Sequence, residues 1–90
     1  MENTFKKALA SFLAYCQKII NISTKNQSIL TTESHRKYIR IVDNHRYGQN
    51  AWGFINKTNG DILEAVSWIT PCKHPIGNIY KPETWINIDY

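Results

Sequence analysis

Residues 50–68 read NAWGFINKTNGDILEAVSW, and this stretch decides the fold because an Asn-Gly pair stands between two apolar runs. Such a pair is the strongest short-range signal for a β-hairpin. We predict a three-residue loop in which Gly60 takes the left-handed conformation, so that Ile55 pairs with Leu63. This register determines which side chains share each face of the sheet.

The predicted register gives the hairpin two chemically different faces. One face carries mostly small side chains, which would let a helix pack closely against the sheet. The other face carries most of the aromatic side chains. The first face is expected to hold Ala51, Gly53, Ile55, Leu63, Ala65 and Ser67, and the second Trp52, Phe54, Ile62, Glu64, Val66 and Trp68.

The segments around the hairpin differ in composition. Apolar side chains from Phe5 to Ile20 recur at spacings of three and four residues, which indicates one face of an amphipathic helix. The next segment is rich in Ser, Thr, Asn and Gln, as linkers are. We expect a helix over about 4–20, a polar linker over 21–35, a β-meander over 37–68, and a loop and tail over 69–90. Within the meander, the strands are expected at about 37–42, 50–56 and 62–68, with a hairpin loop over 43–49.

A chain of 90 residues has room for one hydrophobic core. We therefore predict a single small domain over 1–90 with an α+β fold, in which the N-terminal amphipathic helix packs on a three- or four-stranded antiparallel β-meander. The tail from Trp85 to Tyr90 alternates apolar and polar residues. It either forms the fourth strand or folds across the sheet.

The charge of the chain bears on its partners and its location. The formal net charge of +4 favours acidic partners, although the excess is modest and is spread along the sequence. No apolar stretch is long enough to cross a bilayer. We expect a cytoplasmic protein and no membrane partner.

The aromatic face suggests a binding surface. Trp52, Phe54 and Trp68, with Tyr38 and Arg40 from the preceding strand, would form a stacking platform beside a cation. Bases stack on aromatic rings whatever their sequence, so such a surface would favour single-stranded nucleic acid. The alternative is structural, because the C-terminal tail could cover the same aromatic side chains.

A second candidate binding segment follows the hairpin. Lys73 and His74 lie between Pro71 and Pro75, which stiffen the backbone, and Lys81 follows closely. These cations would contact an anion such as a phosphate. The alternative is a rigid crossover loop without a binding role.

Catalytic and metal-binding patterns find little support in this sequence. Cys72, His74, Asp61 and Glu64 match no catalytic dyad or triad, and the histidines lack the spacing of metal ligands. No glycine-rich phosphate loop is present. We expect a protein that is not an enzyme and has no cofactor or metal.

Four segments carry a resemblance to a known group of proteins. They read KYIRIV (37–42), GFINKTNGDIL (53–63), AVSWITPCKH (65–74) and GNI (77–79). This pattern resembles a group of small uncharacterised proteins of tailed bacteriophages. In that group a basic residue, an alanine and an arginine stand where this chain has Ile69, Cys72 and Ile76, and these departures weaken an anion-binding role for the loop. The resemblance implies a phage source and a shared fold, without an activity. For a phage-encoded chain, the expected location is the cytoplasm of the host cell.

Two functions of different classes follow from these observations. The first is a small basic accessory protein that binds single-stranded nucleic acid through the aromatic and basic sheet face. The second is a protein-protein interaction module, either an inhibitor or modulator of a host factor or a self-assembling structural component. Both use an exposed apolar face, and a homo-oligomer is compatible with the second. The candidate binding residues are Tyr38, Arg40, Trp52, Phe54, Trp68, Lys73, His74 and Lys81.

Overall fold

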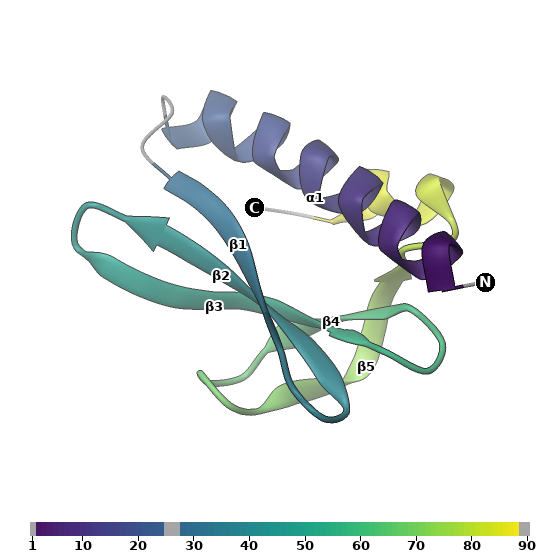
Figure 1. Cartoon of the computed structure of the whole chain (residues 1–90). Coiled ribbons are helices and arrows are strands. Elements are labelled where there is room, and N and C mark those ends of the chain that lie inside the picture. The colour runs from purple at the N-terminus through teal and green to yellow at the C-terminus, as the bar shows by residue number, and fades with distance from the viewer. Residues whose placement is uncertain (1, 25–27, 89–90) are drawn as a thin grey trace.

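The computed structural model describes residues 2–24 and 28–88 and consists of one long helix, a five-stranded sheet and a short 3₁₀ helix (Figure 1). The strands are all antiparallel to their neighbours and follow the order β1-β2-β3-β4-β5. The elements are α1 (Glu2–Thr24), β1 (Ser28–Ser34), β2 (Tyr38–His45), β3 (Gly48–Asn56), β4 (Asp61–Ala65), β5 (Pro71–Asn78) and η1 (Pro82–Asn87). The predicted α+β class is confirmed, whereas the predicted number of three or four strands is wrong.

The two extra strands lie where a linker and a loop were expected. β1 occupies much of the predicted polar linker, of which residues 25–27 lie outside the described residues. Its polar side chains are compatible with a strand because β1 is at the edge of the sheet and most of them face solvent. β5 contains Pro71 and Pro75, which an edge strand tolerates because one row of its N–H groups has no strand partner.

The helix lies across one face of the sheet and supplies the centre of the core (Figure 1). Phe12 is fully buried, with its ring centroid 5.8 Å from that of Trp52 and 5.2 Å from that of Trp85. The expected amphipathic helix therefore forms, and it extends beyond the predicted 4–20 at both ends. The main core consists of Phe12, Cys16, Ile39, Ile41, Ile55, Ile62, Ile79 and Trp85.

The central hairpin differs from its predicted register by one residue. Ile55 pairs with Ile62, so Leu63 lies opposite Phe54 and not opposite Ile55. The loop has four residues, since the Gly60 N–H donates to the carbonyl of Asn56 at 2.8 Å. The left-handed conformation predicted for Gly60 is confirmed by its φ of 81°. The extra loop residue moves Ile62 to the helix-covered face and Leu63 to the opposite face, which corrects the predicted division of side chains.

A β-bulge in β3 changes the position of the first tryptophan. Ile41 pairs with Gly53 while Val42 pairs with Ala51, so Trp52 is the extra residue of β3. A bulged residue leaves the regular alternation of faces. Trp52 consequently packs against Phe12 on the helix-covered face. The first hairpin also has a shorter turn than the predicted loop 43–49, because its strands end at His45 and restart at Gly48.

The tail folds across the sheet and does not add a strand. η1 lies beside α1 (Figure 1), and the buried Trp85 donates from its indole nitrogen to the carbonyl of Asn78 at 2.9 Å. Its ring centroid is 5.5 Å from that of Tyr15. The tail thus adds no strand, and it folds over the helix-covered face and not, as one predicted alternative had it, over the aromatic side chains of the opposite face. The last two residues lie outside the described part of the chain.

The side chain of Gln17 in helix α1 forms hydrogen bonds with the backbone of the edge strand β1. The Gln17 amide oxygen accepts a hydrogen bond from the Leu30 N–H at 2.7 Å, and its nitrogen donates to the Ser28 carbonyl at 2.8 Å. The amide thus takes the place of a neighbouring strand for the first half of β1. Partners of this kind matter because unpaired backbone groups at an edge invite association with other chains.

Replacing Gln17 should therefore destabilise the junction between helix and sheet. We expect Gln17→Ala to lower the free energy of unfolding by about 1–2 kcal/mol, because two backbone groups lose their partner. Urea denaturation followed by circular dichroism measures this change. The control is Lys18→Ala at the adjacent exposed position, expected to change stability by less than about 0.5 kcal/mol. Equal losses in the two variants would contradict the edge-pairing role.

Among the described residues, no helix is both long and apolar enough to cross a membrane.

Candidate interaction site

The sheet face opposite the helix is organised around a buried arginine. Arg40 is 7% exposed, and its Nε donates a hydrogen bond to the Trp68 carbonyl oxygen at 2.8 Å. Its Nη1 donates to the carboxylate of Glu33 in an ion pair. The guanidinium carbon lies 4.4 Å from the centroid of the Trp68 ring, which adds a cation–π contact. Arg40 therefore joins β1 and β2 to the connection between β4 and β5.

That connection, residues 66–70, is termed the Trp68 loop. The N–H groups of Val66 and Ser67 both donate to the Thr70 carbonyl, at 2.8 and 3.2 Å, so the loop closes on itself. Three apolar side chains remain at the surface, with Val66 exposed by 66%, Trp68 by 39% and Ile69 by 74%. The backbone hydrogen bonds close the loop, and Arg40 contacts its Trp68 residue.

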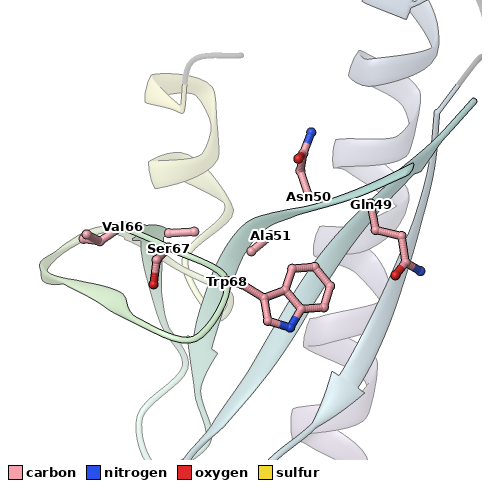
Figure 2. A pocket seen from close by; sticks show the side chains of 7 residues that line it. Gln49, Asn50, Ala51, Val66, Ser67 and Trp68 are labelled. Atoms are coloured by element: carbon pink, nitrogen blue, oxygen red, sulfur yellow. The ribbon is translucent and has the colours of Figure 1, made fainter. Parts of the chain in front are cut away.

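A groove lies between the Trp68 loop and the start of β3. The pairing of β3 with β4 runs from the Ile55–Ile62 pair to the Gly53–Glu64 pair. Beyond the Gly53–Glu64 pair the two strands separate. The groove has a volume of about 280 Å³. Figure 2 shows the Trp68 indole against β3, with Val66 and Ser67 on the other side of the groove. Its lining residues are Gln49, Asn50, Ala51, Ala65, Val66, Ser67 and Trp68.

The structure does not bring the predicted aromatic platform together. Trp52 lies on the helix-covered face, as described above, and Phe54 is only 3% exposed. Tyr38 is half-buried, with its ring 6.1 Å from that of Phe54 in an edge-on contact. Arg40 is enclosed by its own partners. Trp68 is the member of the predicted platform that remains exposed at the surface.

The basic residues predicted after the hairpin are at the surface. Lys73 and His74 are exposed on β5, and Lys81 is exposed just before η1. None of the three forms an ion pair with an acidic side chain in the described part of the chain. They are separate from the buried Arg40.

Sequence reasoning missed three members of this site. Glu33 falls in the predicted linker, Ile69 is treated only as a departure from a basic residue, and Val66 is placed on the aromatic face but not among the candidate binding residues. The alternation Ile39-Arg40-Ile41 was a usable signal, because it places Arg40 on the opposite face of the strand from two core residues. A charged residue on a face that also carries Phe54 needs a partner, and Glu33 supplies it.

The described residues also bear on metal binding. Across residues 2–24 and 28–88, no group of three or more His, Cys, Asp or Glu side chains lies close enough together to hold a metal ion.

Comparison with known proteins gives a family without an assigned activity. A model of a family of unknown function, DUF7717, matches residues 2–86. Neither the curated proteins nor the solved structures contain a match. The match extends from the start of α1 into η1, and so includes the helix, the whole sheet and the Trp68 loop. The chain therefore belongs to the DUF7717 family.

Proposed function

We propose that this protein is a non-enzymatic protein-binding module that uses the Trp68 loop as its anchor. In this proposal the partner is a protein of the bacterial host, in keeping with the resemblance of the sequence to small phage proteins. The Trp68 side chain would enter a pocket of the partner, and Val66 and Ile69 would make further apolar contacts from the same loop. Aromatic side chains with apolar neighbours are the usual anchors of protein interfaces.

The observation that carries the proposal is the exposure of three apolar side chains on one short loop that two backbone hydrogen bonds close. Exposed apolar clusters mark interaction sites more often than isolated apolar residues do. Anchoring by Arg40 lowers the entropy lost on binding, because the loop is already ordered before the partner arrives. The adjacent groove adds the amide side chains of Gln49 and Asn50, which can hydrogen-bond to a partner backbone.

A pair of isoleucine variants tests this function. We expect Ile69→Ser to weaken partner binding by about tenfold or more, because it removes an apolar contact from the anchor. Ile86→Ser is the matched control, since Ile86 is 75% exposed and Ile69 74%, but Ile86 lies on η1. The measurement is quantitative recovery of bacterial proteins on the immobilised wild type and variants, with a photo-crosslinking residue at Val66 to identify direct contacts. Equal recovery on the two variants would contradict the assignment of the anchor.

Single-stranded nucleic-acid binding is the second candidate. It is supported by the net charge of +4 and by the exposure of Lys73, His74 and Lys81 without a described acidic partner. Fluorescence anisotropy of labelled single-stranded DNA and RNA, with duplex as control, distinguishes it from protein binding. Salt-dependent binding that is lost on Trp68→Ala would favour this candidate over the first.

A further inference from the structure

The second half of β1, from Thr31 to Ser34, lacks the hydrogen bonds that Gln17 forms with the first half. Hydrogen bonds in an antiparallel strand point alternately to the two sides. The Leu30 N–H points outward to Gln17, whereas the His35 N–H points inward to the Tyr38 carbonyl at 2.9 Å. The backbone groups of Thr32 and Ser34 therefore point outward as well. For these groups, no hydrogen bond to a described residue outside the sheet is recorded.

The two edges of the sheet are protected unequally. β5 carries Pro71, Pro75 and Lys73, residue types that discourage the addition of another strand. Residues 31–34 of β1 are all exposed and include no proline or lysine. In Figure 1, β1 starts beneath α1 and runs away from the helix. At the end that Gln17 does not cover, no described residue outside the sheet is hydrogen-bonded to the outer backbone groups, so an incoming strand can pair there.

A groove lies next to this open edge on the helix-covered face. Its volume is about 680 Å³, and Phe5, Leu9 and Ile39 give it an apolar lining. Ser34 also lines the groove, so it meets the end of β1. A strand added beside Ser34 would direct every second side chain to the same face as the groove.

Among the described residues that line the groove, the charged ones are both lysines. Lys6 and Lys57 line it, and neither is paired with an acidic side chain that the structure describes. Arg36 and Lys37 form the adjacent turn between β1 and β2 and are exposed. Glu33, the acidic residue of β1, is already paired with Arg40 on the other face. This arrangement attracts acidic groups and repels a second copy of the same basic edge.

We propose that the open edge at Thr32 and Ser34, with the neighbouring groove, binds an extended acidic peptide segment of another protein by strand addition. Backbone hydrogen bonds to Thr32 and Ser34 hold the segment, and its apolar side chains enter the groove. Its Asp or Glu residues pair with Lys6 and Lys57. This site is separate from the Trp68 loop, so its test does not depend on the function proposed above.

The test uses a fluorescein-labelled peptide in which valine alternates with threonine and glutamates flank both ends. Binding to the whole protein is measured by fluorescence anisotropy. We expect Lys57→Glu to weaken binding by about tenfold, because the variant repels the peptide, and Lys18→Glu to change it by less than about twofold. A version of the peptide flanked by lysines should bind far more weakly. Equal binding of the two peptides, or no binding near millimolar protein, would overturn the proposal.

Two further measurements report strand addition itself. Thr32→Pro removes one outward N–H group and leaves the inward hydrogen bonds of β1 intact, so binding should fall by about tenfold. Amide hydrogen exchange on the wild-type protein should slow at Thr32 and Ser34 when the peptide is added, and this readout does not depend on a folded variant. Unchanged exchange at both amides would overturn strand addition.

Competing occupants of the edge give different results. A single-stranded oligonucleotide could displace the peptide without any slowing of hydrogen exchange at Thr32. That result would overturn the proposal and would indicate a general anion-binding site. Concentration-dependent dimerisation that Thr32→Pro abolishes would show that a second copy occupies the edge, and would also overturn it.

Discussion

Phe12→Ala is expected to lower the free energy of unfolding by about 3–5 kcal/mol, which is the range for truncating a fully buried aromatic side chain. Phe12 is 0% exposed and lies between Trp52 and Trp85, so its loss opens a cavity where the helix, the sheet and the tail meet. A domain of this size has a total stability of about 5–13 kcal/mol. The variant should therefore be partly unfolded near 37 °C. Urea denaturation followed by tryptophan fluorescence measures the loss.

Two variants calibrate this result. Phe12→Leu retains most of the apolar volume and should cost clearly less than Phe12→Ala. Tyr47→Ala removes an aromatic side chain that is 85% exposed, and should change stability by less than about 0.5 kcal/mol. If the buried and the exposed aromatic truncations cost the same, the packing of α1 on the sheet would be wrong.

Arg40→Ala should have the second-largest effect, about 2–4 kcal/mol of lost stability. The substitution leaves the Trp68 carbonyl without its donor, Glu33 without its cation and a cavity beneath the indole ring. Arg40→Lys should not restore stability, because an ammonium group lacks the planar, forked geometry that reaches both partners and stacks on the ring. Hydrogen exchange should also become faster across the Trp68 loop.

Arg46→Ala is the matched control for Arg40→Ala. Arg46 is also an arginine near an aromatic ring, 5.7 Å from the Tyr47 centroid, but it is exposed. Its loss should change stability by less than about 0.5 kcal/mol and leave exchange in the Trp68 loop unchanged. Full stability of Arg40→Lys would show that charge alone, without the forked geometry, holds the loop.

Local sequence signals predicted several elements of this fold correctly. The three-and-four spacing of apolar residues identified α1, and the strand predicted over about 37–42 coincides with the first part of β2. The Asn-Gly pair placed the turn between β3 and β4 and the left-handed Gly60. These predictions were correct because helix periodicity, strand alternation and turn conformation depend on residues close together in the chain. The exposed Trp68 at the candidate site was also recognised from sequence.

The tertiary structure decided the rest. The edge strand β1 has no apolar alternation of its own and exists through its pairing with β2 and the Gln17 side chain. One extra loop residue and one bulge moved Leu63 and Trp52 to the faces opposite to those predicted, because each shift of one residue reverses a strand's alternation.

Arg40 at the candidate site also combines a feature that follows from local sequence with features that follow only from the fold. Its position on a strand face followed from the sequence, but its partners did not. Glu33 and Trp68 lie 7 and 28 residues away along the chain, and only the folded sheet brings them to one guanidinium group. Local sequence patterns were thus enough to locate the helix and the turn of the central hairpin, but not the register of that hairpin. Long-range pairing determined which of them are buried, because burial depends on neighbours that are distant in sequence.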